Sequence, residues 1–342
     1  SATPSVESYF NAITNKYGLI KLDKRFGNVS LPKIIVNDLK ESKSKKNFSG
    51  NFSQLLIKNI RDAIDNNEQI ILFQNRRGHS PYLECSSCGF VYQCINCDVS
   101  LTYHIDTNQL KCHHCGYNEK NNIRCKKCSS DNILKRGVGT QQIEEEIKQI
   151  FPLINVKRMD HDSTRKKNSF QEIINGFEQN DFEILIGTQM LTKGLDFKNV
   201  SLVGVINADS LIYFPDFRSQ EKCFQLLQQV SGRAGRFKKQ GSVVIQTFNP
   251  KHNLIKKIVN DDFKGMFDEQ LNQRFIFDYP PYTRLIKIIL KNKDLTKLIR
   301  ASNWLSEALK NQFKNERLYY INYSFYRLIN YWYIDYNIKS SR

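Results

Sequence analysis

Residues 184–197 read ILIGTQMLTKGLDF, an apolar run that passes directly into a polar loop containing two glycines. A short apolar run bounded by such a loop is typical of a buried strand. Further apolar runs recur along the chain, and stretches with helical spacing alternate with them. This alternation predicts βαβ units and a mostly parallel sheet covered by helices on both faces, which is an α/β fold.

Ligands of such sheets bind at the carboxyl ends of the strands. Thr188 and Gln189 leave the 184–186 run at this end, so we expect them to contact a ligand, although any strand–loop–helix unit shows the same pattern. Thr140 is expected to cap the amino end of a helix. The expected strands are 69–73, 154–159, 182–186, 201–206 and 242–247, and the expected helices are 52–64, 140–150, 169–177 and 220–230.

The two ends of the chain depart from this alternation. Residues 1–50 are polar and broken, and they finish in a Lys-, Ser- and Asn-rich stretch that indicates a loop or linker. The tail 319–342 is crowded with Tyr, Ile and Asn, and its fold is not predicted. Between Pro250 and this tail, an α+β domain is expected to begin with helices at 253–259 and 263–275, a strand at 284–290 and a helix at 295–313.

The cysteines point to metal. Eight of the nine form four C-x-x-C pairs: Cys85/Cys88, Cys94/Cys97, Cys112/Cys115 and Cys125/Cys128. Two such loops supply the four thiolates of a closed, tetrahedral zinc site, so eight ligands predict two structural Zn²⁺ ions. Binding energy on the order of 10 kcal/mol would then fold a segment too small to fold alone.

Several pairings of these loops are open. The favoured one is nested: Cys94, Cys97, Cys112 and Cys115 form an inner site, and Cys85, Cys88, Cys125 and Cys128 form an outer site. Gly89 and Gly116 follow cysteines at positions where a positive φ is often needed. Because eight cysteines suffice, the nearby histidines are expected at the surface or facing nucleic acid: His104, His113 and His114. Cys223 stands alone and is expected to be a buried thiol.

Composition narrows the class of partner. The 342 residues carry a formal net charge of +17, with a pI near 9.4, which favours a polyanionic partner and first of all nucleic acid. A proteome rich in Lys and Asn would produce the same charge. The sequence contains neither an apolar run long enough for a membrane helix nor a signal peptide. We therefore expect a cytoplasmic protein whose cysteines bind metal. A chain that begins with Ser1 is expected to be a fragment or a processed product.

Residues 229–236, QVSGRAGR, present two arginines close together. The helix carrying Gln229 is expected to end at Gly232, and Gly235 permits a tight turn that lets Arg233 and Arg236 project together. Arginine is permanently charged and its donor fork suits phosphate, so such residues can stabilise charge on a transferred γ-phosphoryl group. The alternative is a solvated basic turn, because two lysines follow.

The stretch 229–236 resembles motif VI of superfamily 2 helicases. Residues 187–197 resemble motif V, 73–78 resemble the strand and loop of motif IV, and the opening SATPS (1–5) resembles motif III. A four-pair cysteine module between motifs IV and V resembles one family, the primosomal replication-restart DNA helicases, from motif III onward. Further stretches that fit this family are 158–162, 207–209 and 214–218.

The resemblance implies a RecA-like second motor lobe of an ATP-dependent 3′–5′ DNA helicase that acts in primosome assembly at stalled forks. The expected domains are the end of a first lobe with a linker (1–50), a second lobe (51–250) with a zinc-binding insertion (83–130), and a partial C-terminal domain (251–342). The implied partners are forked or single-stranded DNA, primosome proteins and single-strand-binding proteins in the bacterial cytoplasm, associated with the nucleoid.

The resemblance also assigns roles to residues. Gln229, Arg233 and Arg236 would face the γ-phosphate of ATP. Gly194 and Asp196 would line the nucleotide side of the lobe. The DNA backbone would be held by Thr188, Gln189 and Arg76, and the zinc module would assist duplex separation and partner contacts.

One departure from the family is large. No G-x-x-x-x-G-K-[ST] stretch occurs in the 342 residues, so the chain lacks a phosphate-cradling loop with its lysine. It would therefore supply half of an ATPase site, need the first lobe to bind ATP with Mg²⁺, and be inactive alone. The alternative is a non-catalytic zinc-containing protein that binds DNA or a partner.

Overall fold

The structure is a computed structural model. It describes residues 1–22, 31–44, 48–74, 82–96, 99–104, 108–112, 116–120, 124–136, 139–160, 163–164, 168–192, 197–235, 240–312, 318–328 and 331–341.

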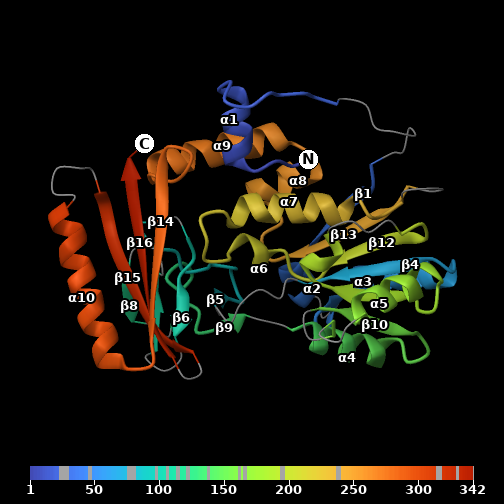
Figure 1. Cartoon of the computed structure of the whole chain (residues 1–342). Helices are drawn as coiled ribbons and strands as arrows, with labels where there is room; N and C mark the ends of the chain where they lie inside the picture. Colours follow the sequence, from blue (N-terminus) through green and yellow to red (C-terminus); the bar gives the residue numbers. More distant parts are fainter. Residues whose placement is uncertain are drawn as a thin grey trace.

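A six-stranded parallel sheet forms the core of one side of the molecule, at the right of Figure 1. All of its neighbouring strands pair in parallel, as the alternation of strands and helices predicts. In order across the sheet the strands are β1 (Lys33–Asp38), β13 (Ser242–Thr247), β12 (Val200–Val205), β4 (Gln69–Phe73), β11 (Ile184–Gly187) and β10 (Val156–Met159).

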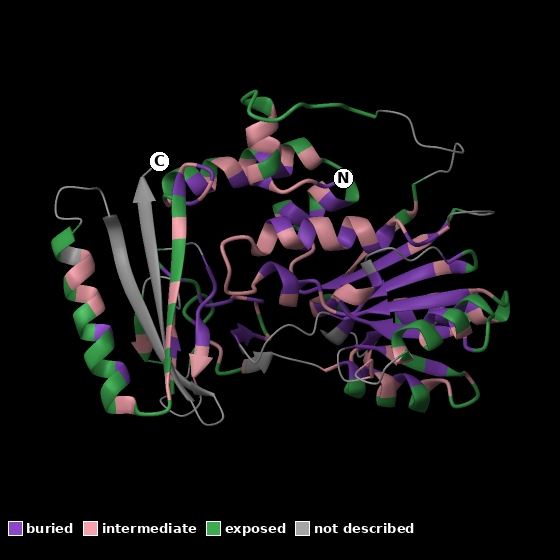
Figure 2. Ribbon diagram, in the orientation of Figure 1, coloured by how far each residue is buried: buried purple, intermediate pink, exposed green. Residues whose placement is uncertain are grey.

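Helices cover both faces of this sheet, because side chains of a strand alternate between its faces. On β4, Ile71 and Phe73 join one apolar core, whereas Ile70 and Leu72 join the other. The first core is covered by α5 (Ser169–Glu178), α7 (Ser219–Ser231) and α8 (Asn253–Val259), and the second by α3 (Gln54–Asp65) and α4 (Thr140–Ile150). The sheet is accordingly the most deeply buried layer of the molecule (Figure 2).

The zinc module is an insertion in the chain between β4 and α4. It leaves through β5 (Tyr82–Cys85) and returns through β9 (Ile133–Arg136), which pair antiparallel. A second small sheet orders β6 (Thr102–His104), β7 (Gln109–Lys111) and β8 (Asn118–Lys120). A compact apolar cluster of the module includes Leu101, Leu83 of β5 and Leu110 of β7, so it joins the two small sheets.

The C-terminal part is α+β, as expected. After α8, helix α9 (Phe263–Ile276) leads to an antiparallel sheet of order β14-β16-β15, with bounds Thr283–Asn292, Tyr331–Ser341 and Leu318–Leu328. Helix α10 (Leu295–Gln312) packs on this sheet through Leu298. The tail therefore contains two long strands where the sequence pattern predicts no element.

Short elements complete the described chain: α1 (Val6–Ile13), α2 (Leu39–Ser44), β2 (Phe48–Ser49), β3 (Phe52–Ser53), the 3-10 helix η2 (Gln189–Thr192) and α6 (Asp209–Ile212). None of the described helices is long and apolar enough to span a membrane.

Two local expectations were wrong. Strand β1 lies within residues 1–50, where the polar, broken pattern predicted no strand. Among the described strands it pairs with β13 alone, at the edge of the sheet, and it is half-buried, so its apolar run is short and flanked by polar residues. Gly139, not Thr140, is the N-cap of α4. The Thr140 hydroxyl donates instead to the buried carboxylate of Asp160, at the end of β10.

Gln246 connects three segments at the carboxyl edge of the sheet, the edge where its parallel strands end. It is fully buried. Its Oε1 accepts from the Ser53 N–H at 2.8 Å, and its Nε2 donates to the carbonyls of Asn51 and Ile206 at 2.9 Å each. A single amide thus positions the start of α3 against β12 and β13.

We predict that Gln246→Met lowers the free energy of unfolding by about 1–3 kcal/mol, because buried backbone groups lose their partners. Urea unfolding would measure this loss. Gln240→Met is the matched control, since Gln240 is exposed and donates only to the Leu31 carbonyl in the described contacts; its change should stay within about 0.5 kcal/mol. Equal losses in both variants would contradict the assignment.

Candidate functional site

Four thiols of the zinc module lie together. The Sγ atoms of Cys85, Cys88, Cys125 and Cys128 all lie within 4.8 Å of one another. The Cys85–Cys128 and Cys88–Cys125 sulfur pairs are both 3.6 Å apart. Sulfurs bound tetrahedrally at about 2.3 Å from zinc are about 3.8 Å apart. This outer thiol cluster, which the nested pairing anticipates, therefore fits a four-thiolate zinc ion.

The four C-x-x-C loops share one backbone geometry. In each, the first cysteine's N–H donates to the carbonyl five residues later, at 2.7–2.9 Å: Cys85 to Phe90, Cys94 to Val99, Cys112 to Tyr117 and Cys125 to Ser130. In three loops the residue after the second cysteine has a positive φ and donates back to the first cysteine's carbonyl: Gly89, Gly116 and Ser129. The two glycines therefore adopt the conformation that the sequence predicts for them.

The inner group is described in part. Cys94 and Cys112 are buried in the module's apolar cluster, and Cys97 and Cys115 lie outside the described residues. Of the histidines, His104 lies half-buried on β6, and His113 and His114 also lie outside the described residues.

The outer thiols differ in acidity before any cation binds. Burial raises the pKa of the Cys88 thiol to about 12. At Cys85 burial acts in the same direction, but hydrogen bonds from the backbone N–H groups of Cys88 and Ser87 outweigh it and lower the pKa to about 7. A four-thiolate metal site must therefore release protons as it forms.

The arginine turn, residues 232–235, follows the last residue of α7. Gly232 is the C-cap of this helix, and Gly235 has φ +72°. The Gly235 N–H donates to the Val200 carbonyl at 2.9 Å, which holds the turn against the amino end of β12. Arg233 is 8% exposed and Gln229 is half-buried. Arg236 lies outside the described residues, so the structure places one of the two predicted arginines.

The predicted DNA-backbone residues lie at the opposite edge of the sheet. Thr188 follows the carboxyl end of β11, where it is 8% exposed, and Gln189 opens η2. Arg76, Gly194 and Asp196 lie outside the described residues. The structure therefore separates Thr188 and Gln189, at the carboxyl edge, from the arginine turn, at the amino edge.

Residues 3–6 lie along α7. The Gln229 Nε2 donates to the Thr3 hydroxyl at 3.4 Å, and the Gln225 Nε2 donates to the Pro4 carbonyl at 3.2 Å. The Val6 N–H donates to Glu221 at 3.0 Å, and the Val6 side chain is fully buried. The helix that carries Gln229 is thus in direct contact with the SATPS stretch.

A buried charge network, which sequence reasoning missed, joins this segment to α9. Arg274 is 1% exposed; its Nη2 donates to Glu221 at 2.5 Å, and its Nη1 lies 3.2 Å from Glu7. Arg218 donates to the same Glu7 oxygen at 2.6 Å. The Phe217 ring stacks on Tyr279 with centroids 4.3 Å apart. No local pattern links these residues; among them, only Phe217 and Arg218 belong to a stretch, 214–218, that fits the family resemblance.

The pKa values of the two carboxyls of the network shift in opposite directions. Burial is the largest influence at Glu221 and raises its pKa. At Glu7 burial is outweighed by Arg274 and then Arg218, which together lower the pKa below its usual 4.5.

Elsewhere in the lobe, burial raises the pKa of Asp209, although the Phe248 N–H and Thr247 hydroxyl donate to it. The fully buried Cys223 thiol also has a raised pKa because of its burial, as the lone cysteine predicts.

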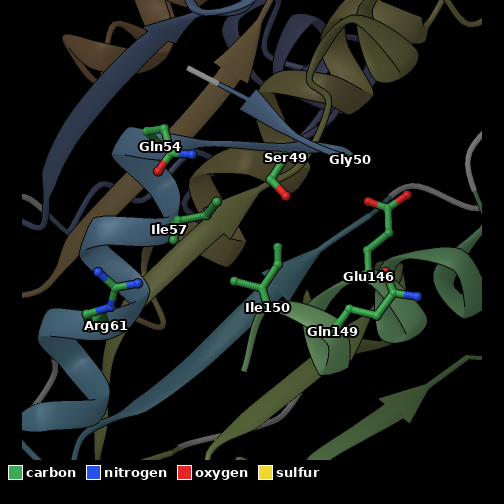
Figure 3. A pocket seen from close by; sticks show the side chains of 8 residues that line it. All are labelled: Ser49, Gly50, Gln54, Ile57, Arg61, Glu146, Gln149 and Ile150. Carbon is green, nitrogen blue, oxygen red and sulfur yellow. The ribbon is translucent and has the colours of Figure 1, made fainter. Parts of the chain in front are cut away.

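A separate pocket of about 380 Å³ lies between α3 and α4 (Figure 3). Arg61 and Gln54 line it from α3, and Glu146 lines it from α4. The Glu146 carboxylate accepts from the backbone and side-chain N–H groups of Asn51, both at 2.7 Å. None of the predicted site residues lines this pocket.

Two family models match adjoining parts of the chain. Residues 94–120 match a family model described as the PriA DNA helicase Cys-rich region domain. Residues 118–238 match the helicase conserved C-terminal domain. The first match contains the inner cysteines, and the second contains the arginine turn.

Curated relatives match nearly the whole chain. Replication restart protein PriA of Bacillus subtilis is 40% identical over 310 residues, which is 91% of this chain and 38% of that protein. The protein of the same name from Haemophilus influenzae is 40% identical over 90% of this chain and 41% of its own length. That from Synechocystis is 39% identical over 90% and 38%. The chain thus spans about two-fifths of the length of these relatives.

We predict that Glu7→Gln lowers the free energy of unfolding by about 1–3 kcal/mol at neutral pH, because Arg218 and Arg274 lose a charged partner. Since the folded pKa of Glu7 is lowered, its stabilising effect is complete above the usual value of 4.5 and is lost as the pH falls through the folded value. The difference between wild type and variant should therefore shrink in acid.

Thermal unfolding across a pH series would measure this difference. Glu178→Gln, at an exposed position on α5, is the matched control and should leave the curve unchanged. Parallel pH curves for wild type and Glu7→Gln would show that the network does not hold the ionised form of Glu7.

Proposed function

Because this chain belongs to the PriA family and matches the carboxyl-terminal portion of its members, we propose that it is the second motor lobe of an ATP-dependent 3′–5′ DNA helicase. In this proposal the lobe acts in replication restart and primosome assembly at stalled forks. Its domains would be the end of a first lobe with a linker (1–50), the second lobe (51–250) with its zinc insertion (83–130), and a partial C-terminal domain (251–342).

One observation carries the proposal. The side chain of Gln229, on the helix that ends in the arginine turn, contacts Thr3 in the SATPS stretch. In a two-lobed motor, α7 and the arginine turn belong to the second lobe, and the SATPS stretch belongs to the end of the first lobe. Their contact is the arrangement that a nucleotide bound between two lobes requires.

The proposed roles of single residues are those that the family resemblance implies. Gln229, Arg233 and Arg236 face the γ-phosphate of ATP, where a guanidinium stabilises the charge that develops during transfer. Gly194 and Asp196 line the nucleotide side. Thr188 and Gln189, at the carboxyl edge of the sheet, hold the DNA backbone together with Arg76. The first lobe would supply the phosphate-cradling loop that these 342 residues do not contain.

The zinc module is proposed to bind two structural Zn²⁺ ions, one at the outer thiol cluster and one at Cys94, Cys97, Cys112 and Cys115. The shared hydrogen-bond geometry of the four loops supports the second site. In addition, an N–H two residues along donates to the first cysteine's sulfur in both an inner and an outer loop, Asn96 to Cys94 and Lys127 to Cys125, at 3.4 Å each. Zinc would crosslink loops that have little apolar core of their own.

Forked or single-stranded DNA, other primosome proteins and single-strand-binding proteins are the proposed partners, in the bacterial cytoplasm. The net charge of +17 supports a nucleic-acid partner. A second candidate function is a non-catalytic zinc-containing protein that binds DNA or a partner. The four clustered thiols and the net charge of +17 support this candidate as well, because neither requires ATP.

We predict that the purified chain holds two zinc ions, as measured by elemental analysis. Cys112→Ser and Cys125→Ser should each remove one ion, because each destroys a different four-thiolate site. Cys223→Ser, which alters the lone buried thiol, should remove none. Retention of one ion by the wild type, or loss of both in either ligand variant, would refute two separate sites.

The motor proposal is tested in a protein that joins this chain to a PriA-type first lobe. Arg233→Ala together with Arg236→Ala should lower DNA-stimulated ATP turnover by about 10³-fold or more, while DNA affinity stays nearly intact. Replacing both Lys238 and Lys239 by Ala is the matched control, since it removes the same charge from the adjacent stretch and should preserve turnover.

Loss of DNA binding in the arginine variant would mean that these residues contact DNA. It would favour the second candidate. This chain without the first lobe should show no steady ATP turnover, and turnover by the pure chain that Arg236→Ala abolishes would overturn the half-site assignment.

A further inference from the structure

The outer zinc loop lies directly against two side chains at the carboxyl edge of the six-stranded sheet. The Lys40 Nζ donates to the Cys88 carbonyl at 2.7 Å, and the Asn249 Nδ2 lies 3.4 Å from the Gly89 carbonyl. A Cβ on Gly89 would stand 2.9 Å from the Lys40 Cε and 3.2 Å from the Asn249 Oδ1. The loop therefore fits between these side chains only because residue 89 has none.

Lys40 and Asn249 are themselves held by the sheet. Lys40 lies in the first turn of α2, directly after β1, and its N–H donates to the Asp38 carboxylate at 2.8 Å. Asn249 follows β13, and its N–H donates to the Thr247 hydroxyl at 3.0 Å. Both residues thus project from the carboxyl edge of the sheet, so the zinc loop contacts a rigid support.

Asn249 also contacts two polar side chains beneath the zinc loop, those of Tyr213 and Asp209. Its Nδ2 lies 3.2 Å from the Tyr213 hydroxyl and 3.4 Å from the fully buried Asp209 carboxylate. Three acceptors therefore share two amide protons, and the contact with Gly89 is the weaker of the two contacts to the zinc loop. Lys40 makes the shorter bond and carries the charge.

The charge of Lys40 suits this position. Four thiolates and one Zn²⁺ ion carry a net charge of −2, and an ammonium on the carbonyl of the ligand Cys88 offsets part of it. Groups that contact ligands in this way orient them and tune the stability of the metal site. The two solvent-side lysines of the outer cluster, Lys126 and Lys127, lie on the opposite loop and are exposed.

We propose that Lys40 is a positioning residue, assisted by Asn249, that holds the outer zinc loop on the carboxyl edge of the motor-lobe sheet and slows loss of its zinc. The inference rests on the zinc occupancy proposed above. Because Thr188 follows β11 at this same edge, the contact fixes the zinc module relative to the residues proposed to hold DNA.

The rate of zinc transfer from the full chain to a chromogenic chelator tests this inference without any activity measurement. The two proposed sites should release zinc in two phases. Lys40→Met should accelerate one phase by roughly tenfold or more and leave the other unchanged. Lys40→Arg, which keeps the charge and the donor, should restore slow release, and Asn249→Ala should have a smaller effect in the same direction.

Lys127→Met is the matched control, because it removes the same charge from the outer cluster at an exposed position and should not change either phase. Hydrogen exchange supplies a second readout: residues 82–91 should exchange faster in Lys40→Met, whereas β11 should not change. An unchanged β11 also shows that the variant is folded.

Wild-type release kinetics in Lys40→Met, or equal acceleration by Lys127→Met, would overturn the inference. A wild-type chain that holds no zinc would instead refute the proposed metal sites. The two failures are therefore distinguishable.

Discussion

The rest of the structure depends on the parallel pairing of β4 with β11 on one side and β12 on the other. All five residues of β4 are buried, and their alternation supplies both apolar cores at once. Parallel strands also oblige the chain to cross from one edge of the sheet to the other after every strand. The two edges therefore present different groups: the zinc module and Thr188 at the carboxyl edge, and the arginine turn at the amino edge.

The contacts that connect segments far apart in the sequence are polar, although both cores of the sheet are apolar. Arg274 meets Glu7 and Glu221 where residues 1–13, α7 and α9 converge. Asp209, Asn249 and Lys40 meet where the sheet supports the zinc loop. Buried charge pairs add little net stability compared with apolar packing, but the loss of one partner is costly. Such joints penalise any other arrangement of the segments that they connect.

This division of labour is consistent with the proposed motor. Apolar cores make the lobe rigid, whereas orientation-specific polar contacts connect it to its neighbours: the end of a first lobe and the zinc module. Helix α7 takes part in both, because Phe224 and Leu227 lie in the core while Glu221, Gln225 and Gln229 contact residues 3–6. Helix α7 thus connects the arginine turn directly to the amino-terminal segment.

The sequence by itself determined the α/β class, the approximate place of most strands and helices and the eight clustered cysteines, because apolar periodicity and C-x-x-C spacing are local signals. It missed β1, whose pairing partner lies some two hundred residues away. It also missed the two strands of the tail, where β15 pairs with β16 and β16 pairs in turn with β14, earlier in the chain. It assigned Thr140 to a cap because it could not foresee Asp160 as a competing acceptor. Only the tertiary structure decided which thiols meet at the outer cluster, that Arg274 joins Glu7 to Glu221, and that Lys40 supports a cysteine carbonyl. These contacts join residues that no sequence periodicity relates. Burial makes each contact necessary, because it removes the water that would otherwise form hydrogen bonds with these polar groups.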